Sequence, residues 1–189
     1  MEKRNKWKTW QSTLSDLDLK KLVFLDESSL NLAYTRLYGW AKSDQRINEG
    51  LKDVRFKRQS ILSTIRLNGE QVPLVFEGTL DGELLVEYVR TCLVPSLGED
   101  DVVVWDNSAV HTSKLVVEAL KVCGVKVVCL PPYSPDFNPI ELLWAYLKAG
   151  LRKLKARTVE TLITAIHSIL SNVSPELIAA WVKHCGYKQ

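Results

Sequence analysis

The 189-residue sequence lacks three features that would place it outside the cytoplasm. No apolar run approaches the roughly 18 residues of a membrane-spanning helix, which argues against a membrane partner. The N-terminal residues carry charge with no apolar segment behind them, so we expect no secretory signal. The few cysteines show no C-x-x-C spacing, which argues against a zinc site and is typical of buried thiols in a reducing compartment. They are Cys92, Cys123, Cys129 and Cys185.

The sequence also lacks a strong excess of charge of either sign, so composition alone gives no argument for nucleic acid. The net charge is +3, and 46% of the residues are hydrophobic, enough for a sizeable core. Basic residues instead concentrate in residues 36–58, which contain seven basic and three acidic residues. We interpret this stretch as a basic loop that faces DNA or a partner, with a solvated charged loop as the alternative. Its candidate DNA contacts are Arg46, Arg55, Lys57 and Arg58.

Hydrophobic periodicity predicts one α/β domain over residues 21–189, preceded by a helical remnant at 1–20. Asn68-Gly69 between apolar runs is a strong hairpin signal. The order of elements fits a ribonuclease-H-like layout, in which three antiparallel strands precede two parallel ones. We therefore expect a ribonuclease-H-like mixed five-stranded sheet flanked by helices. The expected strands are 21–26, 59–67, 71–76, 101–106 and 125–130, and the expected helices are 81–92, 113–123, about 138–151, 159–170 and 175–184.

Three carboxylates are candidates for a single site. Asp26 and Asp106 each end a predicted strand, and Glu141 opens the helix after a proline-rich loop. Ligands of such sheets bind just beyond strand ends, where a packed helix can bring a third acid. Because three neighbouring carboxylates repel one another, a hard divalent cation is the simplest way to keep them ionised. Two Mg²⁺ or Mn²⁺ ions can clamp the attacking and leaving oxygens of a displacement at phosphorus.

Each acid also has a purely structural interpretation. Asp26 and Asp106 precede polar residues and can cap turns. In Asn138-Pro139-Ile140-Glu141, asparagine at the cap, proline at the first helical position and glutamate at the third resemble a capping box. Taken one at a time, none of the three acids is therefore decisive.

Three sequence blocks together resemble a DDE transposase of the mariner superfamily, in its bacterial insertion-sequence branch. The blocks are VFLDES, VVVWDNSAVH and LPPYSPDFNPIELLWAYLK, and 34 residues separate Asp106 from Glu141, the spacing of that branch. The resemblance covers about residues 20–170 and implies a ribonuclease-H-like fold and a two-metal DNA strand-transfer reaction. It assigns Asp26, Asp106 and Glu141 as the metal-binding catalytic acids.

The same resemblance implies residues that support the acids and the partners that they act on. Asn107 and His111 match accessory positions, and Glu27 follows the first acid as it often does in the family. The implied partners are double-stranded DNA, both element ends and target, and a second copy of the chain when active. Relatives carry a helix-turn-helix region before the catalytic domain, and we expect it to be encoded separately here or lost by truncation.

The helix that bears Glu141 continues into a basic stretch with a predicted stripe. Lys148, Arg152 and Lys155 step by four and three residues, which puts them on one helix face. A basic stripe beside a metal site is a natural phosphate track, although cations also favour a helix C-terminus. We interpret the three residues as DNA contacts.

The sequence therefore predicts a transposase catalytic domain that cleaves DNA phosphodiesters and transfers strands of an insertion sequence, using two Mg²⁺ or Mn²⁺ ions. We expect it in the bacterial cytoplasm, on the nucleoid when bound to DNA. One alternative is a non-catalytic transposase-derived fragment that binds DNA or oligomerises, as an inhibitor or relic. Another is a ribonuclease-H-type hydrolase, which uses the same chemistry on RNA–DNA hybrids.

Overall fold

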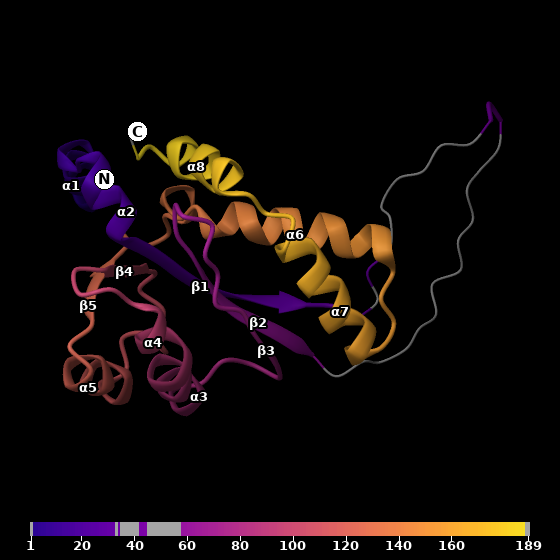
Figure 1. Cartoon of the computed structure of the whole chain (residues 1–189), viewed down its shortest axis with the longest axis horizontal. Helices are drawn as coiled ribbons and strands as arrows, with labels where there is room; N and C mark the ends of the chain where they lie inside the picture. The colour runs from indigo at the N-terminus through magenta and orange to yellow at the C-terminus, as the bar shows by residue number, and fades with distance from the viewer. Residues whose placement is uncertain (1, 33, 35–41, 45–57, 188–189) are drawn as a thin grey trace.

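The computed structural model describes residues 2–32, 34, 42–44 and 58–187. Its centre is a five-stranded sheet in the order β3-β2-β1-β4-β5 (Figure 1). β1 pairs antiparallel with β2 and parallel with β4, β3 pairs antiparallel with β2, and β5 pairs parallel with β4. The expected mixed five-stranded sheet is confirmed. The strands are Leu22–Leu30 (β1), Gln59–Ile65 (β2), Leu74–Glu77 (β3), Val102–Trp105 (β4) and Lys126–Cys129 (β5).

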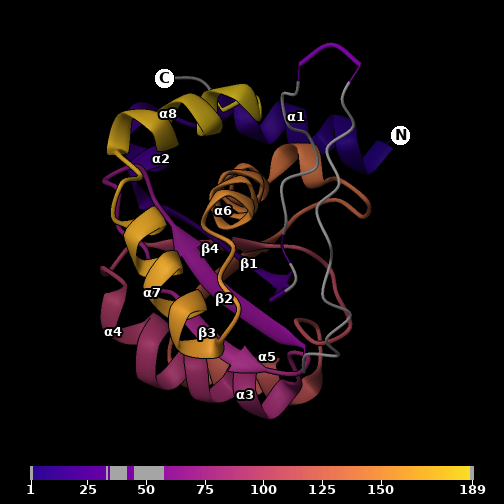
Figure 2. The ribbon, with the colours of Figure 1, turned by 90° about the vertical axis from the view of Figure 1, so that its right-hand side faces the viewer.

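Helices cover both faces of this sheet and bury a separate hydrophobic core on each (Figure 2). One face carries α1 (Glu2–Thr13), α2 (Asp16–Lys21), α6 (Ile140–Leu154), α7 (Val159–Leu170) and α8 (Pro175–His184). The other carries α3 (Gly82–Tyr88), a π-helical turn η1 (Val89–Leu93), α4 (Val94–Ser96) and α5 (Lys114–Val122). A 3₁₀ turn, η2 (Pro135–Phe137), precedes α6. The expected ranges of α7 and α8 match the structure because both helices have capping residues directly before them, Thr158 and Ser174.

Strand β1 is longer than the sequence predicts. The apolar run suggested a strand that ends at Asp26, but β1 continues to Leu30. The extra residues pair with β2, from Asp26 opposite Ser63 to Leu30 opposite Gln59, after β4 has left the sheet. Asp26 therefore lies inside a strand at the level where its parallel neighbour ends. The prediction that it is a strand-terminal residue was wrong, because polar residues within a buried strand hid the continuation.

The hairpin between β2 and β3 also differs in detail from the expected turn. Only Gly69 takes a positive φ, of 91°, and its N–H donates to the carbonyl of Arg66 at 3.0 Å. The Asn68 side chain accepts the N–H of Glu70 at 3.0 Å instead of placing its backbone in the left-handed region. The loop is thus longer than a two-residue turn, with glycine at the one position that requires left-handed backbone.

Helix α1 packs on the segment that leads into α6. Arg4 forms hydrogen bonds of 2.6 and 3.0 Å to the carboxylate of Asp136 and one of 2.7 Å to the hydroxyl of Ser134. Trp7 is buried in the core of this face, and the Gln11 amide donates to the carbonyl of Cys185 at 3.1 Å. The helical segment expected at 1–20 therefore contacts both the loop before α6 and the end of α8.

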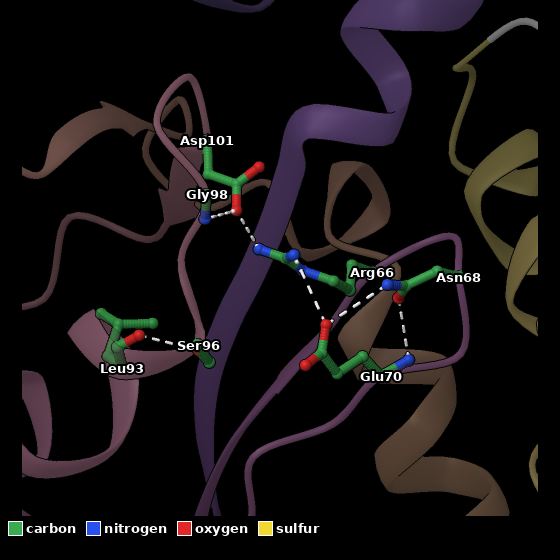
Figure 3. Close-up of polar contacts among 7 residues, drawn as sticks. All are labelled: Arg66, Asn68, Glu70, Leu93, Ser96, Gly98 and Asp101. Carbon is green, nitrogen blue, oxygen red and sulfur yellow. Dashed lines mark hydrogen bonds and ion pairs between the residues drawn. The ribbon is translucent and has the colours of Figure 1, made fainter.

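A buried ion pair ties the β2–β3 hairpin to the entry of β4 (Figure 3). Arg66 pairs with Asp101, and their side chains are only 12% and 10% exposed. Arg66 also lies 3.4 Å from Glu70, while Asp101 accepts the N–H of Gly98 at 2.6 Å. Strand β1 lies between β2 and β4 in the sheet. The ion pair therefore spans β1 and holds β2 and β4 together at the end of the sheet where the chain enters β1 and β4.

Asp101→Asn is expected to lower the free energy of unfolding by about 2 kcal/mol, because it leaves the largely buried Arg66 charge with only its longer contact to the more exposed Glu70. Asp100 is the matched control, since its ion pairs with Lys21 and Lys126 are exposed. Asp100→Asn should leave the urea midpoint nearly unchanged. Equal midpoints for the two variants would contradict the importance of the buried pair.

The cysteine side chains differ in burial. All four thiols are free, and Cys185 is buried, but Cys92 and Cys123 are partly exposed and Cys129 is exposed. The prediction of buried thiols was therefore wrong for Cys129, which lies on an edge strand with its side chain in solvent. In the described part of the chain no single helix is long and apolar enough to span a membrane, and α7 and α8 pass that test only together, across an 83° bend.

Candidate functional site

Asp26 is buried under α6 rather than open to solvent. It projects from β1 on the same face as Phe24 and Leu30, which belong to the core beneath α6. The indole N–H of Trp144 donates to Asp26 Oδ2 at 3.1 Å. Trp144 lies one helical turn after Glu141, so this bond fixes the helix that bears the third acid against the strand that bears the first. Trp144 is only 2% exposed, and no local pattern in the sequence indicates this bond.

Asp106 follows β4 directly, at the level of Asp26 on the neighbouring parallel strand. Its Oδ1 accepts the backbone N–H of Ser108 at 2.9 Å, so the turn-capping interpretation is correct for this residue. The same oxygen lies 2.7 Å from His111 Nδ1. Because an ionised carboxylate only accepts hydrogen bonds, Nδ1 carries the proton. Capping therefore accounts for only part of the environment of Asp106.

His111 is fully buried and links two acids. Its ring stacks on Trp105 with the centroids 4.7 Å apart and the planes 4° apart. Its Nε2 lies 3.5 Å from Glu27 Oε2, on the side away from Asp106. Asn107 turns in a different direction, since its side-chain amide donates to the carbonyl of Leu130. The structure thus brings His111 and Glu27 together with Asp106, and uses Asn107 to hold the start of the loop after β5.

Glu141 lies in the first turn of α6, where the capping-box interpretation is wrong. Helix α6 has no side-chain cap, and the buried Asn138 side chain makes no capping bond. The N–H of Glu141 donates instead to the backbone carbonyl of Asn138 at 3.2 Å. The Glu141 carboxylate accepts no hydrogen bond from the part of the chain that the structure describes. An acid with no structural partner at this position is available for a ligand.

The three acids affect each other electrostatically. Burial, together with the charges of Glu27 and Glu141, raises the pKa of Asp26 to about 7. Burial raises the pKa of Glu141, as do the charges of Asp106 and Glu27, while Lys148 opposes the rise. Asp106 differs, because its hydrogen bond from His111 holds its pKa below the ordinary value. Burial lowers the pKa of His111, but Asp106, Glu27 and Asp26 raise it by more.

This pattern fits a hard divalent cation in its chemistry. Two carboxylates with raised pKa values would gain from a positive charge between them, and carboxylate oxygens are the donors that Mg²⁺ and Mn²⁺ prefer. As they stand, however, no three His, Cys, Asp or Glu side chains among the described residues are close enough to form a ligand set. The acids therefore share one electrostatic environment without a preformed ligand shell.

The predicted basic stripe on α6 is only partly correct. Lys148 and Arg152 lie four residues apart on the helix, and Arg152 lies over the ring of Tyr34 at 5.6 Å. Helix α6 ends at Leu154, and Lys155 takes a left-handed φ of 52° after it. Lys155 is therefore not on the helix face, and its place in the stripe was wrong. Arg46, Arg55 and Lys57 lie outside the described residues. Arg58 is exposed next to β2, and its contact with DNA stays a prediction.

Comparison with known proteins assigns the family. The family model described as DDE superfamily endonuclease matches residues 21–163. The Transposable element Tcb2 transposase of Caenorhabditis briggsae is 28% identical over 151 residues, which cover 71% of this chain and 53% of that protein.

Solved structures share the fold. A Mos1 transposase paired-end complex with left transposon end superposes with a TM-score of 0.78 at 16% identity, covering 98% of this chain and 57% of that one. The catalytic domain of Mos1 mariner transposase superposes with a TM-score of 0.65 at 14% identity, covering 100% of this chain and 92% of that one. The sheet order and flanking helices are thus the ribonuclease-H-like fold that the sequence predicted.

The chain spans about half the length of the whole transposases that it matches. The family model, in contrast, covers most of the chain, from the start of β1 into α7. The chain therefore belongs to the DDE superfamily endonucleases, with sequence similarity to the Tcb2 transposase and the fold of the Mos1 transposase catalytic domain.

Proposed function

We propose that this protein is the catalytic domain of a transposase from the bacterial insertion-sequence branch, which cleaves DNA phosphodiesters and transfers the freed strand. The observation that carries the proposal is the placement of three acids: Asp26 on β1 and Asp106 after β4 lie at the same level of neighbouring strands, and the bond from Trp144 to Asp26 holds the start of α6, with Glu141, against β1. A structural role accounts poorly for Asp26, since burying an ionised carboxylate near other acids destabilises the fold. A reaction that requires the negative charges explains why they are there.

In this proposal each residue of the site has a distinct task. Asp26, Asp106 and Glu141 hold two Mg²⁺ or Mn²⁺ ions, which supply Lewis acidity to the attacking and leaving oxygens when bound. Trp144 and His111 orient Asp26 and Asp106 through their N–H groups. Glu27 places a negative charge 3.5 Å from Nε2, the other nitrogen of the His111 ring. Related structures named as Mos1 paired-end complexes with Mn and with Mg are consistent with this cation chemistry.

The proposed partner is double-stranded DNA, both element ends and target, and the active form is a homodimer. The Mos1 structures are described as paired-end and strand-transfer complexes, which is the basis for both parts of this proposal. Lys148 and Arg152 on α6, with Arg58 beside β2, are the proposed phosphate contacts within the described residues. The protein would act in the bacterial cytoplasm, on the nucleoid when bound to DNA.

The test is DNA cleavage by the 189-residue chain. With Mg²⁺ or Mn²⁺ it should nick a duplex that carries the inverted repeat of its element, and EDTA should abolish the activity. Glu83→Gln, an exposed change on α3 across the sheet, should cleave like the wild type. DNA binding without cleavage would favour the non-catalytic inhibitor or relic instead. A preference for RNA–DNA hybrid would favour the ribonuclease-H-type hydrolase.

His111→Phe tests whether His111 supports cleavage through its hydrogen bond to Asp106 or only through its packing against Trp105. The variant keeps a flat ring against Trp105 but removes the donor to Asp106 Oδ1. We expect cleavage to fall roughly 10- to 100-fold, as is typical when a residue that orients a metal ligand is lost. The measurement is the cleavage rate as a function of Mn²⁺ concentration, with the exposed His167→Phe on α7 as control. Unchanged rates for His111→Phe would rule out the positioning role.

A further inference from the structure

Tyr133 is an exposed aromatic residue held in an unfavourable backbone conformation. Its side chain is 99% exposed, although large apolar groups are usually at least partly covered. Its φ is 53°, in the left-handed region that non-glycine residues rarely adopt. Such strain persists only where surrounding structure imposes it, and it clusters at functional sites. The strain does not serve packing, since almost none of the Tyr133 surface contacts the protein.

The loop that carries Tyr133, residues 131–139, is held rigidly. Arg4 on α1 donates to the carbonyl of Tyr133 at 3.5 Å and to the hydroxyl of Ser134 at 2.7 Å. The Ser134 hydroxyl donates in turn to the carbonyl of Pro132 at 3.1 Å. Prolines at 131, 132, 135 and 139 restrict the backbone further. The loop therefore presents the Tyr133 ring to solvent from a fixed base.

The same loop contributes to the lining of two cavities, of which the second includes the third candidate acid, Glu141. A cavity of about 390 Å³ is lined by Lys3, Lys6 and Trp10 of α1, by Pro131 and Pro132, and by Asn107, the neighbour of Asp106. A second cavity of about 490 Å³ is lined by Lys8, Asp136 and Glu141. Tyr133 thus follows Pro132, which lines the first cavity, and precedes Pro135, which lines the second together with the third acid, Glu141.

The charge of this surface is positive. Helix α1 carries Lys3, Arg4, Lys6 and Lys8 against one acid, Glu2, which pairs with Lys6 at 2.7 Å. The one acid of the loop, Asp136, is neutralised by Arg4. Lysines beside an exposed aromatic ring are the combination that binds single-stranded nucleic acid, with phosphates on the cations and a base on the ring.

We propose that α1 and the loop at 131–139 form a DNA-binding surface, on which Lys3, Lys6 and Lys8 contact phosphates and Tyr133 stacks on an unpaired base next to the scissile phosphate. This inference rests on the proposed function and names a contact surface for that function on α1. A strand in the first cavity would pass from α1 to Asn107, the residue that follows Asp106 in the chain. DNA is favoured over a protein partner because the surface combines an excess of lysine with one exposed ring, since Tyr133 is the one exposed large hydrophobic residue within residues 2–13 and 131–139.

The experiment compares three variants of the full chain on a duplex with a single-stranded end that contains 2-aminopurine, with Ca²⁺ in place of Mg²⁺. Tyr133→Asn removes the ring but tolerates the left-handed backbone, so the urea midpoint should not fall. We expect roughly tenfold weaker binding and loss of 2-aminopurine quenching. Tyr133→Phe keeps the ring and should keep both. Lys3→Gln should lower the dependence of log affinity on log salt by about 0.7 to 0.9.

Several results would overturn this inference. If Tyr133→Asn binds and quenches like the wild type, the ring does not stack on a base. If the variant instead changes the sedimentation coefficient of the free protein, the ring serves contact between copies of the chain. Either result leaves cleavage by the wild type, and hence the proposed function, intact. If the wild type fails to bind this DNA at all at low salt, both the surface and the proposed function are wrong.

Discussion

Asp26→Asn is expected to abolish metal-dependent cleavage and, in EDTA, to make the protein more stable than the wild type. The loss of activity should reach roughly a thousandfold or more, since a carboxylate that holds the catalytic ions has no neutral substitute. The gain in stability follows from the burial of Asp26, which raises its pKa to about 7. Asparagine has a similar shape, carries no charge and can still accept the N–H of Trp144.

The direction of the pKa shift of Asp26 determines how this gain in stability depends on pH. The folded-state pKa of about 7 exceeds the ordinary value of 3.8, so the folded protein binds the proton more tightly than the unfolded chain. Ionisation of Asp26 therefore reduces the stability of the wild type as pH rises from about 4 to about 7. The variant escapes this loss. Its advantage should vanish below about pH 4 and reach a plateau on the order of 3 kcal/mol above pH 7.

Urea unfolding in EDTA at a series of pH values measures both quantities. Glu83→Gln serves as the control, because that carboxylate is exposed on α3. Addition of Mn²⁺ should raise the midpoint of the wild type and leave that of Asp26→Asn nearly unchanged. An inactive variant that is less stable than the wild type at pH 8 would mean that Asp26 is a structural residue.

Asp106→Asn and Glu141→Gln are each expected to reduce cleavage as severely as Asp26→Asn, and the double variant should be no worse than either single one. Residues that act as one unit show this non-additivity, because the first loss already disables the unit. The cleavage rate at saturating Mn²⁺ is the measurement, with folding checked by circular dichroism.

The structure gives a specific reason to expect such coupling. The charge of Asp106 raises the pKa of Glu141, and that of Glu141 raises the pKa of Asp26. Asp100→Asn is the matched control for a lost carboxylate, since that acid makes only exposed ion pairs, with Lys21 and Lys126. If one of the two single variants retains activity, that residue is not part of the site. If the losses multiply in the double variant, the acids act independently.

Local sequence signals predicted most of the fold. Periodic apolar residues predicted α5, α7 and α8, and in the structure Ser113, Thr158 and Ser174 cap these helices by accepting N–H groups of their first turns. The features that these local signals missed depend on contacts between strands that are distant in the sequence. β1 extends past Asp26 only because β2 lies opposite it, and no feature within residues 26–30 indicates that partner.

The composition of the site was predictable, but its contacts were not. Spacing and motif led to Asp26, Asp106 and Glu141, yet the bond from Trp144 to Asp26 joins residues 118 positions apart. The clamp of Arg4 on the loop before α6 spans 132 positions, and a short polar helix gives no sign of it. For Lys155 the error lay in a predicted contact surface rather than in a missed one. The prediction extended the helical spacing to Lys155, but α6 ends one residue earlier, at Leu154. Long-range contacts and helix ends require the tertiary structure.

The most direct test of the central claim is a crystal of the protein soaked in Mn²⁺ and measured at the manganese absorption edge. The proposed function predicts anomalous density among the carboxylates of Asp26, Asp106 and Glu141, with oxygen atoms of all three within about 2.0–2.3 Å of metal. Manganese bound elsewhere, with these three side chains left apart at a concentration that supports cleavage, would contradict the assignment of these acids as one metal site.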